Sequence, residues 1–315
     1  MSDRVALRKI YGQSLLTLGE MYPNIVVLDA DISKSTSTCD FAKKFPERFF
    51  NFGVAEQNML GVAAGLAASG KIPLVNTYSI FASLKACEQI RTSIAYPKLN
   101  VKIVATHGGL DVGKDGVTHQ AIEDIAIMRA IPNMVVIAPA DEVSVRRLLK
   151  AVIDYKGPVF LRYGRSPVPR VYKEDQDIEI GKALIIRDGS DVTFIAIGVM
   201  VNIALKAAKL MAKEGISARI VDMHTIKPLD EEILLKSAEE TKAIVTAEDH
   251  TVNGGLGGAV AEWLGEHYPI PIERIGLKDT FGESGLSEDL FKHYHFTEKD
   301  FVEVAKRVIK RKQGR

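Results

Sequence analysis

Residues 51–59 read Asn51-Phe52-Gly53-Val54-Ala55-Glu56-Gln57-Asn58-Met59 and join a short apolar run to a helical pattern. The run at 49–52 predicts a strand, and the apolar residues that recur after it at helical spacing predict a helix over 57–68. Glu56 therefore stands at the N-terminal end of that helix. A carboxylate there is favoured by the helix dipole and can cap backbone N–H groups, so one interpretation of Glu56 is purely structural. In open α/β sheets, however, ligands bind beyond the carboxyl ends of the strands, so Glu56 is also a functional candidate.

The same alternation of short apolar runs and longer helical patterns extends along the first half of the chain. Expected strands lie at 25–28, 49–52, 74–78, 101–105, 134–137 and 159–162. Expected helices lie at 57–68, 81–95, 120–131 and 142–154. Strands separated by helices are typical of parallel sheets with crossover connections, so the first half is predicted to form one open α/β domain of about six strands.

A second alternation follows an irregular segment. Gly164-Arg165-Ser166-Pro167-Val168-Pro169 interrupts the pattern, and the polar stretch 173–179 follows it, which predicts a linker. Further expected strands lie at 192–197, 218–222, 243–247 and 272–277, and further expected helices at 203–213, 231–240, 257–266 and 299–310. The sequence thus predicts an α/β fold of two domains, each a mostly parallel open sheet flanked by helices.

Composition limits the class of protein. With 315 residues, of which 46% are hydrophobic, the chain can bury two cores of ordinary size. Lys and Arg total 41 against 40 Asp and Glu, and this formal net charge of +1 offers no broad field for nucleic acid or an anionic membrane. The two cysteines form no C-x-x-C pair, and neither a signal peptide nor a run long enough to span a bilayer is evident. A cytoplasmic location is therefore expected.

A polar, glycine-rich loop follows the fourth expected strand and reads Thr106-His107-Gly108-Gly109-Leu110-Asp111-Val112-Gly113-Lys114-Asp115-Gly116-Val117-Thr118-His119-Gln120. Glycines let backbone N–H groups approach a ligand closely, and a long polar loop between buried elements is usually functional. The two histidines and two aspartates also suggest a metal, but they lack compact ligand spacing, so no metal ligand is assigned to this chain. A purely structural loop is the remaining alternative.

Three arginines, Arg8, Arg162 and Arg165, offer forked donors suited to a phosphate. Because the chain carries almost no net charge, an anionic ligand must be bound by individual basic groups of this kind. An arginine near the end of a strand is also often solvated or ion-paired, so that structural alternative stays open for each of the three.

Three motifs, taken in order, resemble those of the transketolase family: residues 51–59, then Thr77-Tyr78-Ser79-Ile80-Phe81, then Gly113-Lys114-Asp115-Gly116-Val117-Thr118-His119-Gln120. The resemblance covers essentially the whole chain. It implies a thiamine diphosphate pyrimidine-binding domain at 1–170, a linker at 171–190 and a transketolase-like C-terminal domain at 191–315. The implied activity is transfer of a two-carbon ketol unit between ketose and aldose phosphates, as in the pentose phosphate pathway, with thiamine diphosphate as cofactor.

The resemblance also assigns residues to the cofactor. Glu56 matches the catalytic glutamate that hydrogen-bonds the aminopyrimidine ring and helps to activate the cofactor. Phe81 and Tyr78 match aromatic positions that pack on this ring, and Asp31 matches an acidic position close to the cofactor. One departure is Leu84, which stands where the family has a further aromatic residue.

The sugar side of the site follows from the same resemblance. The residues matched to the sugar channel, where the two histidines also act in catalysis, are His107, Asp115 and His119. The residues matched to the sugar phosphate are Arg8, Ser35 and Arg165. Arg162 is close enough to Arg165 in the sequence to compete for the phosphate.

One family motif is missing from this sequence. In the family, a Gly-Asp-Gly motif followed by an asparagine binds the diphosphate and its divalent metal on another domain, and this chain has no such motif. The resemblance therefore implies a partner, the N-terminal transketolase subunit, which carries that motif and holds Mg²⁺ or a similar ion. Activity is expected only in the complex, for which the family expectation is a heterotetramer.

Three alternatives to a transketolase stay open. 1-Deoxyxylulose-phosphate synthase has a similar pyrimidine-binding domain and also resembles Gly116-Val117-Thr118-His119-Gln120, but it is normally one long chain. The β subunit of a 2-oxo acid dehydrogenase shares the split architecture, but its loop is not expected to carry residues 115–119. A non-catalytic assembly or regulatory subunit would keep the fold and lose the reaction, and the presence of Glu56 argues against it.

Overall fold

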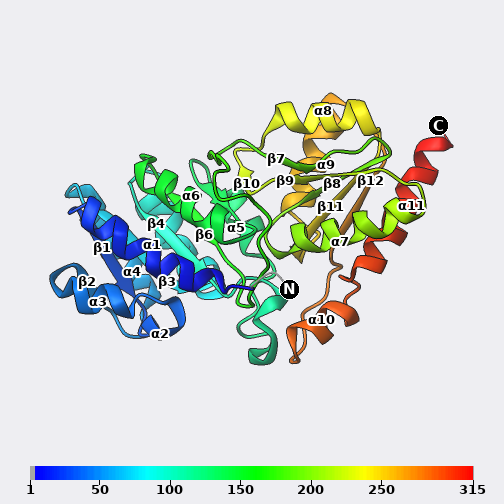
Figure 1. The fold of residues 1–315 in the computed structure, drawn as a ribbon. Coiled ribbons are helices and arrows are strands. Elements are labelled where there is room, and N and C mark those ends of the chain that lie inside the picture. Colours follow the sequence, from blue (N-terminus) through cyan, green and yellow to red (C-terminus); the bar gives the residue numbers. More distant parts are fainter. Residues whose placement is uncertain (1–3, 315) are drawn as a thin grey trace.

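The computed structural model describes residues 4–314 and shows two α/β sheets side by side (Figure 1). The larger sheet has seven strands in the order β10-β5-β6-β4-β3-β1-β2. Its strands are β1 Ile25–Asp29, β2 Phe49–Asn51, β3 Ile72–Tyr78, β4 Lys102–Thr106, β5 Val135–Ile137, β6 Val159–Arg162 and β10 Thr225–Lys227. All pairings are parallel except β10 with β5, which is antiparallel.

Helices cover both faces of this sheet, so its strands are apolar on both sides. One face packs on α1 Leu7–Met21 and α6 Glu142–Asp154. The other packs on α4 Glu56–Ala68, α5 Asp124–Ala130 and η3 Gln89–Ala95. The remaining short helices of this half are α2 Ser33–Thr36, α3 Cys39–Lys44, η1 Pro46–Arg48, η2 Phe81–Lys85 and η4 Leu110–Asp115.

The smaller sheet has five strands in the order β12-β11-β8-β9-β7. Its strands are β7 Leu184–Arg187, β8 Val192–Ala196, β9 Ala218–Asp222, β11 Ile244–Thr251 and β12 Ile272–Leu277. The helices of this half are α7 Val199–Lys213, α8 Glu231–Thr241, α9 Leu256–His267, α10 Ser287–His293 and α11 Glu298–Gln313. Phe194 packs toward α7 and α11, whereas its neighbour Ile195 packs toward α8 and α9, so this sheet is also covered on both faces.

The predicted fold class is confirmed, with differences in its elements. The expected helix at 81–95 is instead two π-helical segments, η2 and η3, and the helix expected from residue 120 begins only at Asp124. β7 lies within the range expected to be linker, where its half-buried residues form an antiparallel edge of the second sheet. α1 has no counterpart among the expected helices because Gly12 and Gly19 interrupt its apolar pattern.

The two halves are physically joined. β10 comes from the second half of the chain, yet it pairs with β5 of the larger sheet through Thr225 and Ile137. Each of the two apolar clusters takes residues from both halves. None of the helices within residues 4–314 combines the length and the apolar character needed to cross a bilayer.

Candidate active site

Glu56 begins α4, just beyond the carboxyl end of β2. Its side chain is only 2% exposed, and among residues 4–314 its carboxylate accepts a hydrogen bond from Lys85 Nζ, at 2.6 Å. The residue at the N-cap position is Ala55, and no side chain caps this helix. Glu56 therefore does not serve as a helix cap, and its buried carboxylate is directed toward η2.

Lys85 is a residue of this site that the sequence motifs did not identify. It ends η2, four residues after Phe81, and its ammonium lies 5.0 Å from the centre of the Phe81 ring. A spacing of four on an expected helix places two side chains on one face, and that was the available signal. Leu84, at the position where the family has an aromatic residue, is 49% exposed.

Four rings form a cluster next to this pair. The ring of Tyr78 lies 4.2 Å from that of His107, 5.9 Å from that of His119 and 5.9 Å from that of Phe81. The rings of Phe81 and His119 are 5.4 Å apart. β3 and β4 are neighbouring parallel strands, so the residues that follow them meet at one edge of the sheet. The structure thus brings together Tyr78, Phe81, His107 and His119.

His107 is held neutral by its surroundings. Its side chain is buried, and its Nδ1 lies 3.0 Å from Thr106 Oγ1. Burial, followed by the nearby guanidinium groups of Arg8 and Arg165, lowers the pKa of His107 to about 3. At neutral pH the imidazole can therefore exchange hydrogen bonds with a ligand without carrying charge.

The segment after β1 carries the predicted cofactor residue Asp31 and the predicted phosphate residue Ser35. Buried Asp29 organises this loop, because it accepts hydrogen bonds from Ile32 N at 2.7 Å, Thr36 Oγ1 at 2.7 Å and Thr38 Oγ1 at 2.9 Å. Asp31 is exposed and accepts from Asn51 Nδ2 at 2.8 Å. That contact ties the loop to residues 51–59.

Arg8 and Ser35 lie next to each other. Arg8 belongs to α1 and donates to the backbone oxygen of Ser35 at 3.1 Å. Gly12 lets α1 approach this loop closely, since a Cβ there would overlap the backbone oxygen of Ser37. Two of the three residues predicted to hold a phosphate therefore converge from different elements.

The structure distinguishes the two arginines that follow β5 in the chain. Arg162 is buried, donates from Nε to Asp124 Oδ2 at 2.9 Å, and donates from a terminal nitrogen to the Asp249 backbone oxygen at 2.8 Å. Arg165 is 39% exposed and lies 3.4 Å from the carboxylate of Asp115. Only Arg165 is placed where a ligand can reach it.

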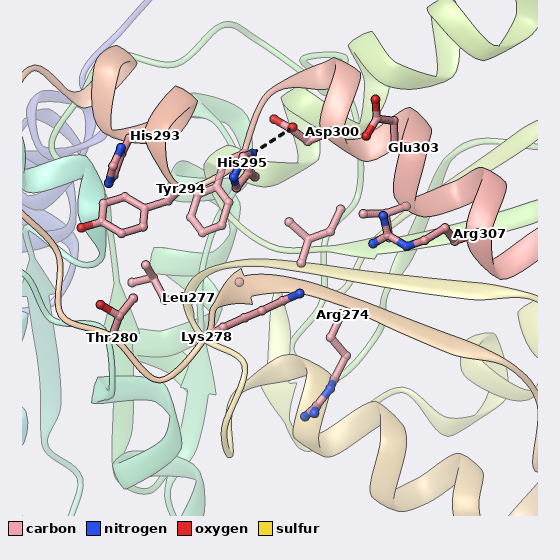
Figure 2. A pocket seen from close by; sticks show the side chains of 14 residues that line it. Arg274, Leu277, Lys278, Thr280, His293, Tyr294, His295, Asp300, Glu303 and Arg307 are labelled. Atoms are coloured by element: carbon pink, nitrogen blue, oxygen red, sulfur yellow. Dashed lines mark ion pairs between the residues drawn. The ribbon is translucent and has the colours of Figure 1, made fainter.

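A separate cavity of about 340 Å³ lies in the second half of the chain (Figure 2). Two of its basic groups already have partners: Arg274 donates to the Val252 backbone oxygen at 2.8 Å, and His295 lies 3.4 Å from the carboxylate of Asp300. None of the predicted site residues lines it. The aromatic cluster, with its buried carboxylate, is therefore the stronger candidate. Within residues 4–314, no three His, Cys, Asp or Glu side chains are grouped so as to hold a metal ion.

The fold and the site define a two-domain α/β protein with a buried carboxylate beside a cluster of aromatic rings and histidines. The family described as transketolase, pyrimidine binding domain, matches residues 3–170, and the transketolase C-terminal domain matches residues 181–300. Together these matches cover more than half of the sequence. The chain belongs to the transketolase family, as predicted, and membership implies dependence on thiamine diphosphate.

Relatives match the chain over nearly its whole length. It is 53% identical to a Methanocaldococcus jannaschii protein named for a transketolase C-terminal section, covering 96% of this chain and 95% of the relative. It is 44% identical to a 6-deoxy-6-sulfo-D-fructose transketolase subunit of a Clostridium species, covering 98% and 96%. A solved split-gene transketolase, an inactive β4 tetramer, has a TM-score of 0.91 and 51% identity, covering 98% of this chain and 100% of that one.

A longer enzyme is also similar. The chain is 37% identical to the 1-deoxy-D-xylulose-5-phosphate synthase of Desulforudis audaxviator, and the match covers 99% of this chain but only 49% of that protein. The match thus spans about half the length of that enzyme.

Residues on this surface suit the flat, hydrogen-bonding pyrimidine end of thiamine diphosphate. The Glu56 carboxylate can bond a ring nitrogen, and the adjoining Phe81 and Tyr78 rings offer apolar faces on which a flat ring can pack. The diphosphate end needs a metal and several donors, and this surface offers neither a group of metal ligands nor a glycine-rich helix start.

Proposed function

We propose that this chain is the pyrimidine-binding subunit of a thiamine diphosphate-dependent transketolase that transfers a two-carbon ketol unit between ketose and aldose phosphates. The observation that carries the proposal is the 2%-exposed carboxylate of Glu56 beside the cluster of Phe81, Tyr78, His107 and His119. Bound thiamine diphosphate supplies the carbon nucleophile and the electron sink for this reaction. Glu56 bonds the aminopyrimidine nitrogen and exchanges a proton with it.

The aromatic residues orient the cofactor. Phe81 packs on the aminopyrimidine face, and Tyr78 supports it from the side of His107. Asp31, which accepts a hydrogen bond from Asn51, is the acidic group that we assign to the cofactor.

The histidines act on the sugar. His107, which is neutral, and His119 act in catalysis by hydrogen-bonding the substrate carbonyl and hydroxyl groups, and Asp115 bonds a hydroxyl. Arg8, Ser35 and Arg165 hold the sugar phosphate. Arg165 is assigned this role in preference to Arg162 because the Arg162 guanidinium is buried against Asp124.

A partner completes the enzyme. The N-terminal transketolase subunit binds the diphosphate through its Gly-Asp-Gly motif and Mg²⁺, and two copies of each chain form a heterotetramer. The need for a partner is supported by the absence of that motif here. Association of this chain with further copies of itself is supported by the β4 tetramer of the similar split-gene transketolase. Within this chain, residues 1–170 bind the pyrimidine, 171–190 link the domains and include the edge strand β7, and 191–315 form the rest of the C-terminal domain.

Reconstitution tests the proposal. The chain is mixed with its N-terminal partner, thiamine diphosphate and Mg²⁺, and offered xylulose 5-phosphate with ribose 5-phosphate, or pyruvate with glyceraldehyde 3-phosphate. Turnover of the two sugar phosphates is expected. Condensation of pyruvate with glyceraldehyde phosphate would instead establish the synthase alternative, and full activity of this chain alone would refute the need for a partner.

A further inference from the structure

Asp249, on β11 of the smaller sheet, reaches across to the loop that follows β4 of the larger one. Its two carboxylate oxygens accept hydrogen bonds from successive backbone groups, Leu110 N at 2.9 Å and Asp111 N at 3.2 Å. These residues begin η4, within the loop that carries His107, Asp115 and His119. A carboxylate of the second domain therefore binds the backbone of the candidate substrate loop.

The fit around this carboxylate is close. Gly109 has a φ of 78°, and a Cβ added to it would overlap the Asp249 carboxylate. On the other side, Arg162 binds the Asp249 backbone oxygen at 2.8 Å and Asp124 at 2.9 Å. Arg162 thus fixes the backbone of Asp249, while the Asp249 carboxylate binds the loop.

Further contacts join the loop to the second domain. Ser287 Oγ donates to the backbone oxygen of Asp111 at 2.9 Å, and Gln120 Nε2 donates to the backbone oxygen of Glu283 at 2.9 Å. These contacts lie at the two ends of the segment 111–120. Asp249 differs from them because it is buried, carries a carboxylate and binds two adjacent amides.

We propose that Asp249 is a positioning residue, through which the C-terminal domain sets the geometry of the substrate loop 107–119. The structural part, a clamp on the backbone of Leu110 and Asp111, stands on its own contacts. The functional part, control of sugar binding through His107, Asp115 and His119, rests on the proposed function.

Charge at Asp249 gives the clamp a pH dependence. Burial raises the pKa of Asp249 to about 7, with Arg162 opposing and Asp111 adding to this rise. Other charged groups around it are Glu248 and His250 on its own strand and Asp124, which binds Arg162. Above this pKa both carboxylate oxygens accept, whereas below it one oxygen carries a proton, so the clamp is weaker at lower pH.

Amide hydrogen exchange on the isolated full chain tests the clamp without any ligand. In Asp249→Asn, one backbone N–H faces an NH₂ group in place of an oxygen, so exchange at Leu110 and Asp111 is expected to rise roughly tenfold. Asp141→Asn is the matched control, because buried Asp141 accepts from Val171 N and Tyr172 N at 2.8 Å each. This control should speed exchange near residue 171 and leave residues 107–116 unchanged.

The pH gives a second readout. After correction for intrinsic rates, protection of Leu110 and Asp111 should grow between pH 6 and pH 8 in the wild-type chain and stay flat in Asp249→Asn. Two results would contradict the clamp. One is unchanged amide exchange at residues 107–116 in the Asp249→Asn variant, and the other is an equal rise of exchange at these residues in the Asp141→Asn control.

Kinetics of the reconstituted holoenzyme test the functional part. Asp249→Asn should raise KM for the ketose phosphate about tenfold, whereas cofactor affinity, followed by fluorescence quenching, stays at the wild-type value. Faster loop exchange with an unchanged KM would refute control of sugar binding. If the wild-type holoenzyme turns over no sugar phosphate, the proposed function is wrong, and the control of sugar binding by Asp249 is wrong with it. Amide hydrogen exchange still tests whether Asp249 holds the backbone of the loop.

Discussion

The ammonium of Lys85 lies 2.6 Å from the Glu56 carboxylate and 5.0 Å from the centre of the Phe81 ring. Lys85 thus stands between two residues proposed to hold the same aminopyrimidine ring. Glu56 is 2% exposed and Lys85 is 45% exposed, so the pair joins a buried anion to a cation that solvent still reaches. The pair compensates the charge of a buried carboxylate that would otherwise be costly.

This ion pair predicts an energetic coupling between its members. Lys85→Met should lower the free energy of unfolding by about 1 kcal/mol, a value discounted for the exposure of the lysine. The same change in a Glu56→Gln background should have almost no effect, because no carboxylate is then left without its partner. Urea denaturation of the wild type, both single variants and the double variant measures the coupling. Additive effects in this cycle would contradict the pairing.

His107 predicts a loss of stability in acid. Its folded-state pKa of about 3 lies below its ordinary value of 6.5, so below pH 6.5 the unfolded chain binds a proton that the folded chain does not. Stability contributed by neutral His107 is therefore present above pH 6.5 and lost as the pH falls toward 3, by up to about 1.4 kcal/mol per pH unit. Unfolding of wild type and His107→Asn at pH 7 and pH 5 checks this. Relative to wild type, the free energy of unfolding of the variant should be more favourable at pH 5 than at pH 7. A difference that is the same at both pH values would contradict this contribution of His107.

Asp222 predicts the opposite slope. Burial raises its pKa to about 8, and Tyr172 donates to its carboxylate at 2.6 Å. Between pH 4 and pH 8 the folded chain holds a proton that the unfolded chain releases, so the contribution of Asp222 to stability is lost as the pH rises. Asp222→Asn should remove this dependence on pH. Relative to wild type, the variant should therefore have a higher free energy of unfolding at pH 8 than at pH 5. Urea midpoints at both values measure it, and parallel pH profiles would disprove it.

Gly109 and Gly70 compare a glycine packed against Asp249 with a glycine in open space. Their φ angles are similar, 78° and 89°, but a Cβ on Gly70 meets no atom within 4 Å, whereas one on Gly109 overlaps the Asp249 carboxylate. Gly70→Ala should cost about 1–2 kcal/mol from the left-handed backbone alone. Gly109→Ala should cost about a further 1–3 kcal/mol, because the added Cβ overlaps Asp249 and because Gly109, with φ 78° and ψ −168°, lies in a backbone region essentially confined to glycine. Thermal unfolding compares the two variants, and equal losses would contradict the greater cost at Gly109.

Much of the fold follows directly from the sequence. The six strands of the first half were expected from their apolar residues, which in β1 form a buried run. β10 was not expected because Thr225–Lys227 contains a single apolar residue, and β7 was not expected because it lies in the range assigned to the linker. The π-helical turns at 81–95 could not be predicted either, because their apolar residues have the same spacing as those of an ordinary α-helix.

The site was partly visible in the sequence. The loops after β1, β3 and β4 were identifiable because parallel strands end at one edge of the sheet, and the rings of Tyr78, Phe81, His107 and His119 do meet there. Contacts between distant segments were not visible. The approach of Asp249 to Leu110, 139 residues away in the chain, depends on how the two sheets pack. Burial of Arg162 against Asp124 depends on the same packing.

The most direct test of the central claim is turnover of Glu56→Gln in the complex with the N-terminal partner, thiamine diphosphate and Mg²⁺. The matched control is Glu88→Gln, an exposed glutamate near η3 that bonds only Gln89 and Thr92 within the described chain. Loss of the proton-exchanging carboxylate should lower kcat about 10²- to 10⁴-fold, with complex assembly intact and the control near wild type. Turnover of Glu56→Gln within a few fold of wild type would contradict the role of Glu56 as the carboxylate that activates the cofactor.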